Sequence, residues 1–146
     1  MEDLALSKSV AGLMASFNFA GYLIGALVAS ADLHFHPRRR WVLASLAASA
    51  LTTAAMGLTT SSTAFFLLRF LGGVASAFVM VLGSTLVLNG LAHAGRPRLA
   101  SVHFAGVGCG ITVSAIVVSL LTALGYDWRA LWTASGVLAF ACLAAA

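Results

Sequence analysis

The amino-acid sequence predicts an all-α membrane protein, a polytopic bundle of five transmembrane helices, and two observations carry this prediction. Apolar residues make up 61% of the 146-residue chain and charged residues only 8%, whereas soluble domains are about 45–50% apolar and about 25% charged. Five long stretches carry no formal charge: residues 9–31, 41–68, 70–95, 99–126 and 130–146. As helices, stretches of this length can cross the hydrocarbon core of a bilayer, which is about 30 Å thick.

The first three spans are expected at about residues 10–31, 41–58 and 63–92. The first follows Glu2 and Asp3, and this acidic start lacks the basic region of a cleaved signal peptide, so we expect the span to remain in the mature protein. Four consecutive hydroxyl residues, Thr59 to Ser62, predict the turn that separates the second span from the third.

The fourth and fifth spans are expected at about residues 99–123 and 129–146. Pro37 and Pro97 both lie between spans, where a missing backbone N–H does not interrupt a helix. We therefore expect a single transmembrane domain over residues 1–146.

The basic residues predict the orientation of these spans. One set of loops holds five arginines, against Lys8 and Arg129 on the other side. The five are Arg38, Arg39, Arg40, Arg96 and Arg98. The positive-inside rule places them in the cytoplasm, with the N-terminus outside and the C-terminus inside. The net charge of +4 therefore reflects the arginines that orient the spans in the membrane, and we expect no nucleic-acid partner.

Small residues recur at helical spacing on three of the expected spans. Helices in lipid gain little from burying apolar surface against each other, so close packing through small residues must hold such a bundle together. We expect this role for Gly21 and Gly25, Gly72 and Gly73, and Gly106 and Gly110.

Four polar residues inside the spans have a possible functional role. Arg69 lies a few residues into the third span, where it either reaches the outer headgroups or serves in pairing or proton coupling. Asn18 and Tyr22 lie one turn apart on the first span, and either bond to a neighbouring helix or line a polar pathway. His103, near the start of the fourth span, is either an interfacial residue or a proton relay.

The sequence contains no pattern for covalent chemistry. The motifs HExxH, CxxC, the P-loop and the nucleophile elbow are all absent. Cys109 and Cys142 fall within spans, where a thiol acts as a small apolar residue. We therefore expect no enzyme activity, no catalytic residue, no cofactor and no metal site.

Two segments resemble signatures of the major facilitator superfamily of transporters. The segment 68–77, LRFLGGVASA, resembles the fourth-helix signature R-x-x-Q-G-x-G-A-A. Its key positions hold Arg69, Gly73 and Ala75, and Gly72 stands in place of glutamine. The segment 106–115, GVGCGITVSA, resembles the fifth-helix antiporter signature G-x-x-x-G-P-x-x-G-G, with Ile111 in place of proline. The likeness is best to the bacterial YbfB-like permeases and covers nearly the whole chain.

The resemblance implies that the five spans correspond to helices two to six of a twelve-helix transporter of the bacterial inner membrane. Helix one and the second half are then missing from this chain. The loop signature G-x-L-x-D-R-x-G-R-R of the family is degenerate here, with Ala29 at the aspartate position.

The same resemblance implies alternating access, with proton-coupled efflux of a small molecule whose identity the sequence leaves open. Its expected partners are the lipid bilayer, the proton, and the remaining helices of a full-length transporter. Asn18, Tyr22 and Arg69 are then candidates for the substrate and coupling pathway. Two other interpretations remain open: a small oligomeric channel or exporter that is complete in itself, and a membrane assembly subunit without transport.

Overall fold

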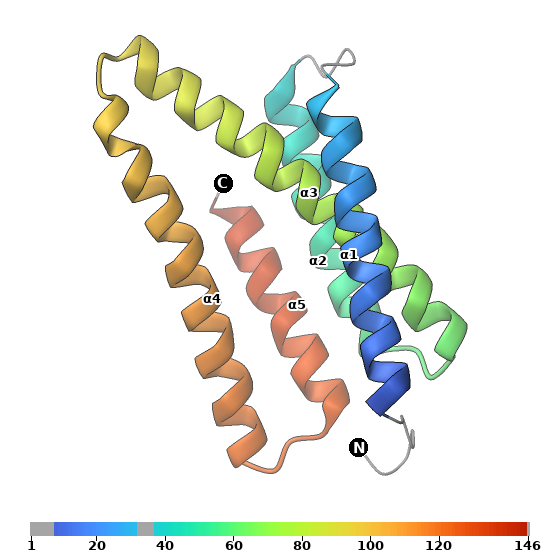
Figure 1. Cartoon of the computed structure of the whole chain (residues 1–146). Helices are drawn as coiled ribbons and strands as arrows, with labels where there is room; N and C mark the ends of the chain where they lie inside the picture. Colours follow the sequence, from blue (N-terminus) through green and yellow to red (C-terminus); the bar gives the residue numbers. More distant parts are fainter. Residues whose placement is uncertain (1–7, 32–36, 146) are drawn as a thin grey trace.

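The computed structural model describes residues 8–31 and 37–145, and these ranges contain helices and no strand (Figure 1). The helices are α1 (Lys8–Ser30), α2 (Arg38–Met56), α3 (Ser62–His93), α4 (Ala100–Ala123) and α5 (Trp128–Ala144). A short 3-10 turn, η2 (Pro97–Leu99), precedes α4. Each helix coincides with one predicted span, and the predicted all-α fold class is confirmed.

The helices differ in how well they suit a membrane crossing. Three segments are long and apolar enough to span one: Gly12–Ser30, Ser62–His93 and Pro97–Ala123. Helix α5 is apolar but shorter. Helix α2 begins with three arginines, which leaves only residues 41–56 for the hydrocarbon core, and these include four hydroxyl residues. For α2 and α5 the crossing stays a prediction, because about 20 apolar residues are the usual requirement.

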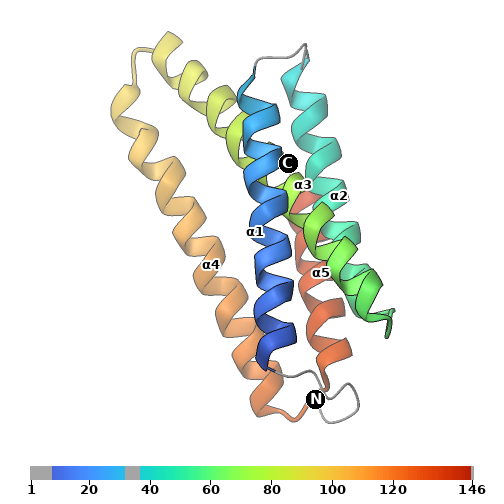
Figure 2. The same cartoon turned by 45° about the vertical axis from the view of Figure 1, so that its right-hand side comes forward.

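Helix α3 is the centre of the bundle. Helix α1 packs along one side of α3, α2 packs along another, and α5 packs on α2. Successive helices run in opposite directions, so α1, α3 and α5 are parallel to one another (Figures 1 and 2). The buried core contains mostly small side chains, with Phe65 and Met56 the largest that are fully buried. Close approach of backbones is therefore what joins these helices, as expected in lipid.

Helix α4 stands apart from this core. None of its residues is buried, and it touches α3 and α5 only slightly, so it leans away from the other helices in two views (Figures 1 and 2). Gly95 and Gly125, in the turns before and after it, have positive φ angles of 67° and 78°. Such angles favour glycine, which lets the chain reverse direction there.

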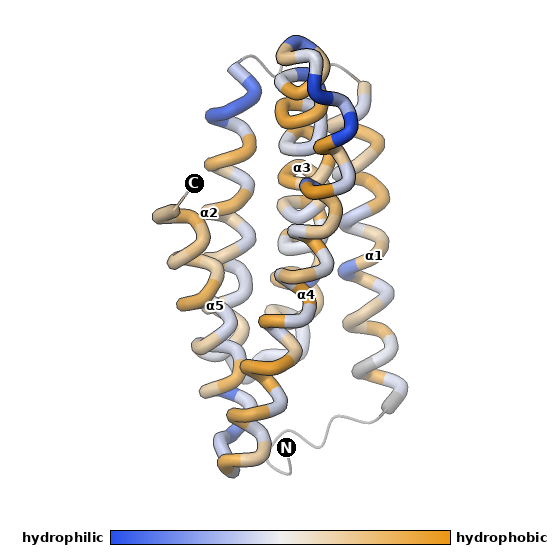
Figure 3. Tube along the Cα trace, turned by 90° about the vertical axis from the view of Figure 1, so that its left-hand side faces the viewer, coloured by the Kyte–Doolittle hydropathy of each residue, from blue (hydrophilic) through white to orange (hydrophobic). Residues whose placement is uncertain are grey.

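The charged residues separate along the bundle axis. All five loop arginines lie at the end where α2 begins and where α3 passes into α4, and this end carries the most hydrophilic segments in Figure 3. Arg129 lies at the opposite end, at the start of α5. The chain thus folds with its basic loops on one side, as the alternating spans require.

Candidate functional site

The contact between α1 and α3 fixes the position of the candidate polar residues. A Cβ atom placed on Gly21 would collide with the backbone carbonyl of Phe70, and one on Gly73 would collide with the backbone carbonyl of Asn18. At Gly25 an added Cβ would lie 2.8 Å from the carbonyl oxygen of Val74. These glycines are therefore places where two helix backbones touch, because any side chain would push the helices apart.

Asn18 and Tyr22 lie on α1 at this contact. The backbone of both residues abuts Gly73, while the side chain of Asn18 is half-buried and that of Tyr22 is 37% exposed. Neither side chain makes a hydrogen bond within residues 8–31 and 37–145. A half-buried amide without a protein partner favours water or a further polar group beside it.

Arg69 lies seven residues after the start of α3, about 10 Å along the helix. Its guanidinium carbon sits 4.3 Å from the ring centre of Trp132 on α5, and its side chain is half-buried. A charge inside a membrane costs at least about 2.5–3.5 kcal/mol, and a cation–π contact returns about 0.5–2 kcal/mol. The Trp132 ring therefore offsets only part of the cost of placing the Arg69 charge in the membrane, so water or an anionic group must provide the remaining stabilisation.

Aromatic side chains extend this cluster towards the bundle end. The rings of Phe65 and Trp128 meet edge to face with centres 5.8 Å apart, and the guanidinium of Arg129 lies 5.0 Å from the Trp128 ring. The carboxylate of Asp127 accepts a 2.9 Å hydrogen bond from the N–H of Ala130 and so caps α5. The α3–α5 contact thus carries two cations and two tryptophans.

The three predicted pathway residues share one level of the bundle without forming one cluster. The rings of Phe17 and Phe66 lie with centres 5.0 Å apart and planes tilted by 36°, which places Asn18 near the level of Arg69 on the parallel helices. However, Arg69 engages Trp132, and no hydrogen bond joins it to Asn18 or Tyr22 among the described residues.

The remaining glycines have different surroundings. An added Cβ on Gly72 would lie 3.3 Å from the hydroxyl oxygen of Thr52 on α2. At Gly106 and Gly110 an added Cβ would meet no atom within 4 Å in the described part of the chain. A packing role for the two α4 glycines stays a prediction.

Two interhelical contacts were not predicted from the sequence. The hydroxyl of Ser84 on α3 and the Nε2 atom of His103 on α4 lie within hydrogen-bond distance at 3.1 Å. Trp132 is not among the candidate functional residues singled out from the sequence, and nothing in the sequence pattern pairs it with Arg69. No group of three or more metal-ligating side chains occurs in the ranges that the structure describes.

A comparison with protein families gives one match over the whole chain. The family model described as "Uncharacterised MFS-type transporter YbfB" matches residues 1–146. No curated protein and no solved structure matches.

Proposed function

Because the chain belongs to the family of YbfB-like transporters of the major facilitator type, we propose that it forms part of a transport pathway for a small molecule. Membership makes it a multi-pass membrane protein with a transport role and gives no indication of enzyme activity. Our proposal adds the mechanism: proton-coupled efflux by alternating access across the bacterial inner membrane. The arginine loops then lie in the cytoplasm and the N-terminus outside.

The observation that carries this proposal is the position of Arg69. Its charge lies within an apolar helix, against Trp132, where the aromatic contact offsets too little of the cost of desolvation. Intramembrane charges that persist at such a cost usually serve ion or substrate movement. Arg69 is the coupling residue in our proposal, and Asn18 and Tyr22 contribute the polar lining from α1.

Further helices complete the pathway in this proposal. Helix α4 has no buried residue, and Gly106 and Gly110 offer open surface on it. Small residues on a transmembrane helix suit close packing against another helix. Additional helices of the transporter are the partners that we propose for this surface. If a second copy of this chain covered the α4 surface instead, that finding would support a complete oligomeric exporter.

Accessibility to water tests the pathway without knowledge of the substrate. Single cysteines at Asn18 and Tyr22 should react with an impermeant, water-soluble thiol reagent in native membranes. A cysteine at Leu51, which is 59% exposed on α2, is the matched control and should react slowly because lipid surrounds it. Equal slow labelling at all three positions would contradict a polar pathway beside α1.

A transport assay on the purified chain distinguishes a transporter that needs additional helices from an oligomeric exporter built of this chain alone. The chain should show no substrate-dependent proton movement in liposomes, measured by an internal pH dye after addition of fractionated host metabolites. Robust movement would favour the oligomeric exporter, because this chain would then need no further helices.

A further inference from the structure

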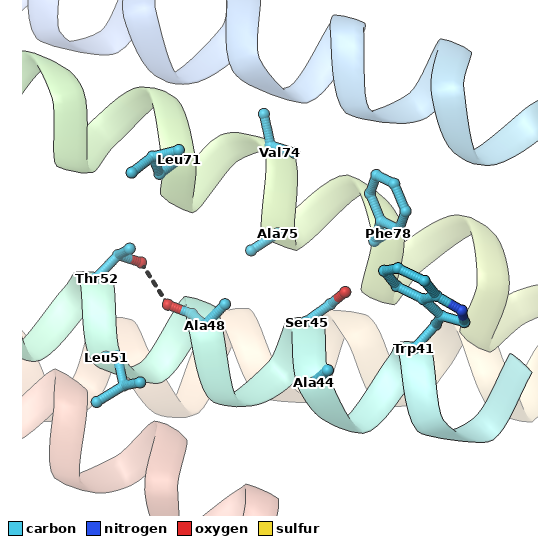
Figure 4. A pocket seen from close by; sticks show the side chains of 10 residues that line it. All are labelled: Trp41, Ala44, Ser45, Ala48, Leu51, Thr52, Leu71, Val74, Ala75 and Phe78. Carbon is cyan, nitrogen blue, oxygen red and sulfur yellow. Dashed lines mark hydrogen bonds between the residues drawn. The ribbon is translucent and has the colours of Figure 1, made fainter. Parts of the chain in front are cut away.

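A groove runs along the surface between α2 and α3, and its lining is almost entirely apolar. It encloses about 510 Å³. Trp41 and Phe78 stand together at one end of it, with their ring centres 6.4 Å apart, and Leu51, Thr52 and Leu71 lie at the other (Figure 4). Its remaining lining residues are Ala44, Ser45, Ala48, Val74 and Ala75.

The groove offers little to a polar occupant. The hydroxyl of Thr52 donates to the carbonyl oxygen of Ala48 at 2.9 Å, drawn as a dashed line in Figure 4. Ser45 is only 8% exposed. From Trp41 to Thr52 the groove follows about 16 Å of helix, which is close to half of the roughly 30 Å hydrocarbon core. This length suits one acyl chain from one leaflet.

Two arginines flank the end of the groove that Trp41 and Phe78 mark. Arg38 precedes Trp41 by three residues, and Arg40 precedes Ala44 by four, so both lie on the groove side of α2 by helical spacing. Arg39 lies on the opposite side of the helix, since residues three and four positions after it do not line the groove. Arg40 is exposed and Arg38 half-buried.

We propose that this groove binds an anionic phospholipid, with an acyl chain between α2 and α3 and the phosphate beside Arg38 and Arg40. Lipid tails already have apolar surroundings in the bilayer, so the groove contributes shape and the two cations contribute selectivity. The site goes beyond the proposed transport function and does not depend on it.

Quenching of Trp41 by brominated acyl chains tests this site directly. The sequence has three tryptophans, so replacing Trp128 and Trp132 with phenylalanine makes Trp41 the sole emitter. The protein is placed in phosphatidylcholine nanodiscs, and phosphatidylglycerol with brominated chains is added in increasing mole fraction. Brominated phosphatidylcholine is the comparison lipid.

We expect the anionic lipid to quench Trp41 at a lower mole fraction than the zwitterionic lipid. A juxtamembrane arginine contributes about 1 kcal/mol towards an anionic headgroup, so Arg40→Gln should reduce this preference about fivefold. Replacing Arg38 as well should reduce it about 25-fold in total. Arg39→Gln is the matched control and should leave the preference unchanged, because it removes the same charge from the other side of α2.

A second variant tests whether the acyl chain of the lipid lies in the groove. Ala48→Leu places a larger side chain in the groove and should abolish the saturable quenching while keeping all three arginines. Equal quenching by both lipids would overturn the proposal. So would an Arg39→Gln effect as large as that of Arg40→Gln, since it would indicate only a diffuse attraction to the basic end.

Discussion

Replacing Gly21 with alanine should destabilise the bundle, because α1 and α3 touch through their backbones there. The new Cβ would collide with the carbonyl of Phe70, which cannot rotate away as a side chain could. At the neighbouring Gly25 the corresponding gap to the Val74 carbonyl oxygen is 2.8 Å, more than half an ångström inside the 3.4 Å at which ordinary contact begins. Helix α1 must therefore move as a whole.

The expected loss of stability is obtained by comparison with Gly106, a glycine whose added Cβ would meet no neighbouring atom in the described chain. Overpacking a well-packed contact costs about 1–3 kcal/mol. Glycine to alanine also improves helix propensity by about 1 kcal/mol, and this gain applies equally to Gly106→Ala, where no atom lies within 4 Å in the described chain. The propensity gain cancels in the difference between the two variants. We expect Gly21→Ala to be less stable than Gly106→Ala by about 1–3 kcal/mol, or about 5- to 150-fold in the unfolding equilibrium.

Unfolding in mixed micelles measures this difference. Both variants are titrated with sodium dodecyl sulfate, and the free energy of unfolding is obtained from circular dichroism and tryptophan fluorescence. Identical midpoints and slopes for the two variants would refute the backbone contact between α1 and α3.

Three further predictions follow from single contacts. Arg69→Lys and Arg69→Ala, made in the complete transporter, should abolish transport and leave membrane insertion intact. Lysine should fail because its flexible ammonium does not reproduce the planar, permanently charged guanidinium. Near-normal transport by the lysine variant would reduce Arg69 to an interfacial anchor. Asp127→Ala should cost about 1 kcal/mol of unfolding free energy by removing the cap on the Ala130 N–H, and an unchanged value would contradict the cap. Cysteines at Ser84 and His103 should be joined by a short bifunctional thiol reagent, because the serine hydroxyl meets the far end of the histidine ring, which a cysteine side chain is too short to replace; failure to cross-link would place α4 elsewhere.

The positions of the helices were predictable because local signals set them. Charge-free stretches indicated all five, and the hydroxyl run from Thr59 to Ser62 marks the turn between α2 and α3. Pro37 lies just before α2, where its fixed φ and missing N–H do no harm. The gathering of the loop arginines at one end follows from the alternating directions of the helices.

The pairing of the helices was not predictable from the same signals. Gly21 and Gly106 each begin a run of small residues at a spacing of four, yet one meets a backbone and the other meets open space. Spacing shows that a helix can pack closely, but it does not identify the partner. The contact between Arg69 and Trp132 likewise depends on α5 packing on α2, from where the Trp132 side chain reaches α3, and no local pattern encodes this arrangement.

The topology of the five helices is the central claim, and α2 is its most demanding test, because this helix begins with three arginines and carries four hydroxyl residues. Single cysteines at Pro37, Ser61, Gly95 and Gly125, in a background without the native cysteines, can be labelled with an impermeant thiol reagent in oriented membranes. We predict labelling of Pro37 and Gly95 from the cytoplasmic face and of Ser61 and Gly125 from the opposite face. Labelling of Pro37 and Ser61 from the same face would show that α2 does not cross the membrane and would contradict the five-span bundle.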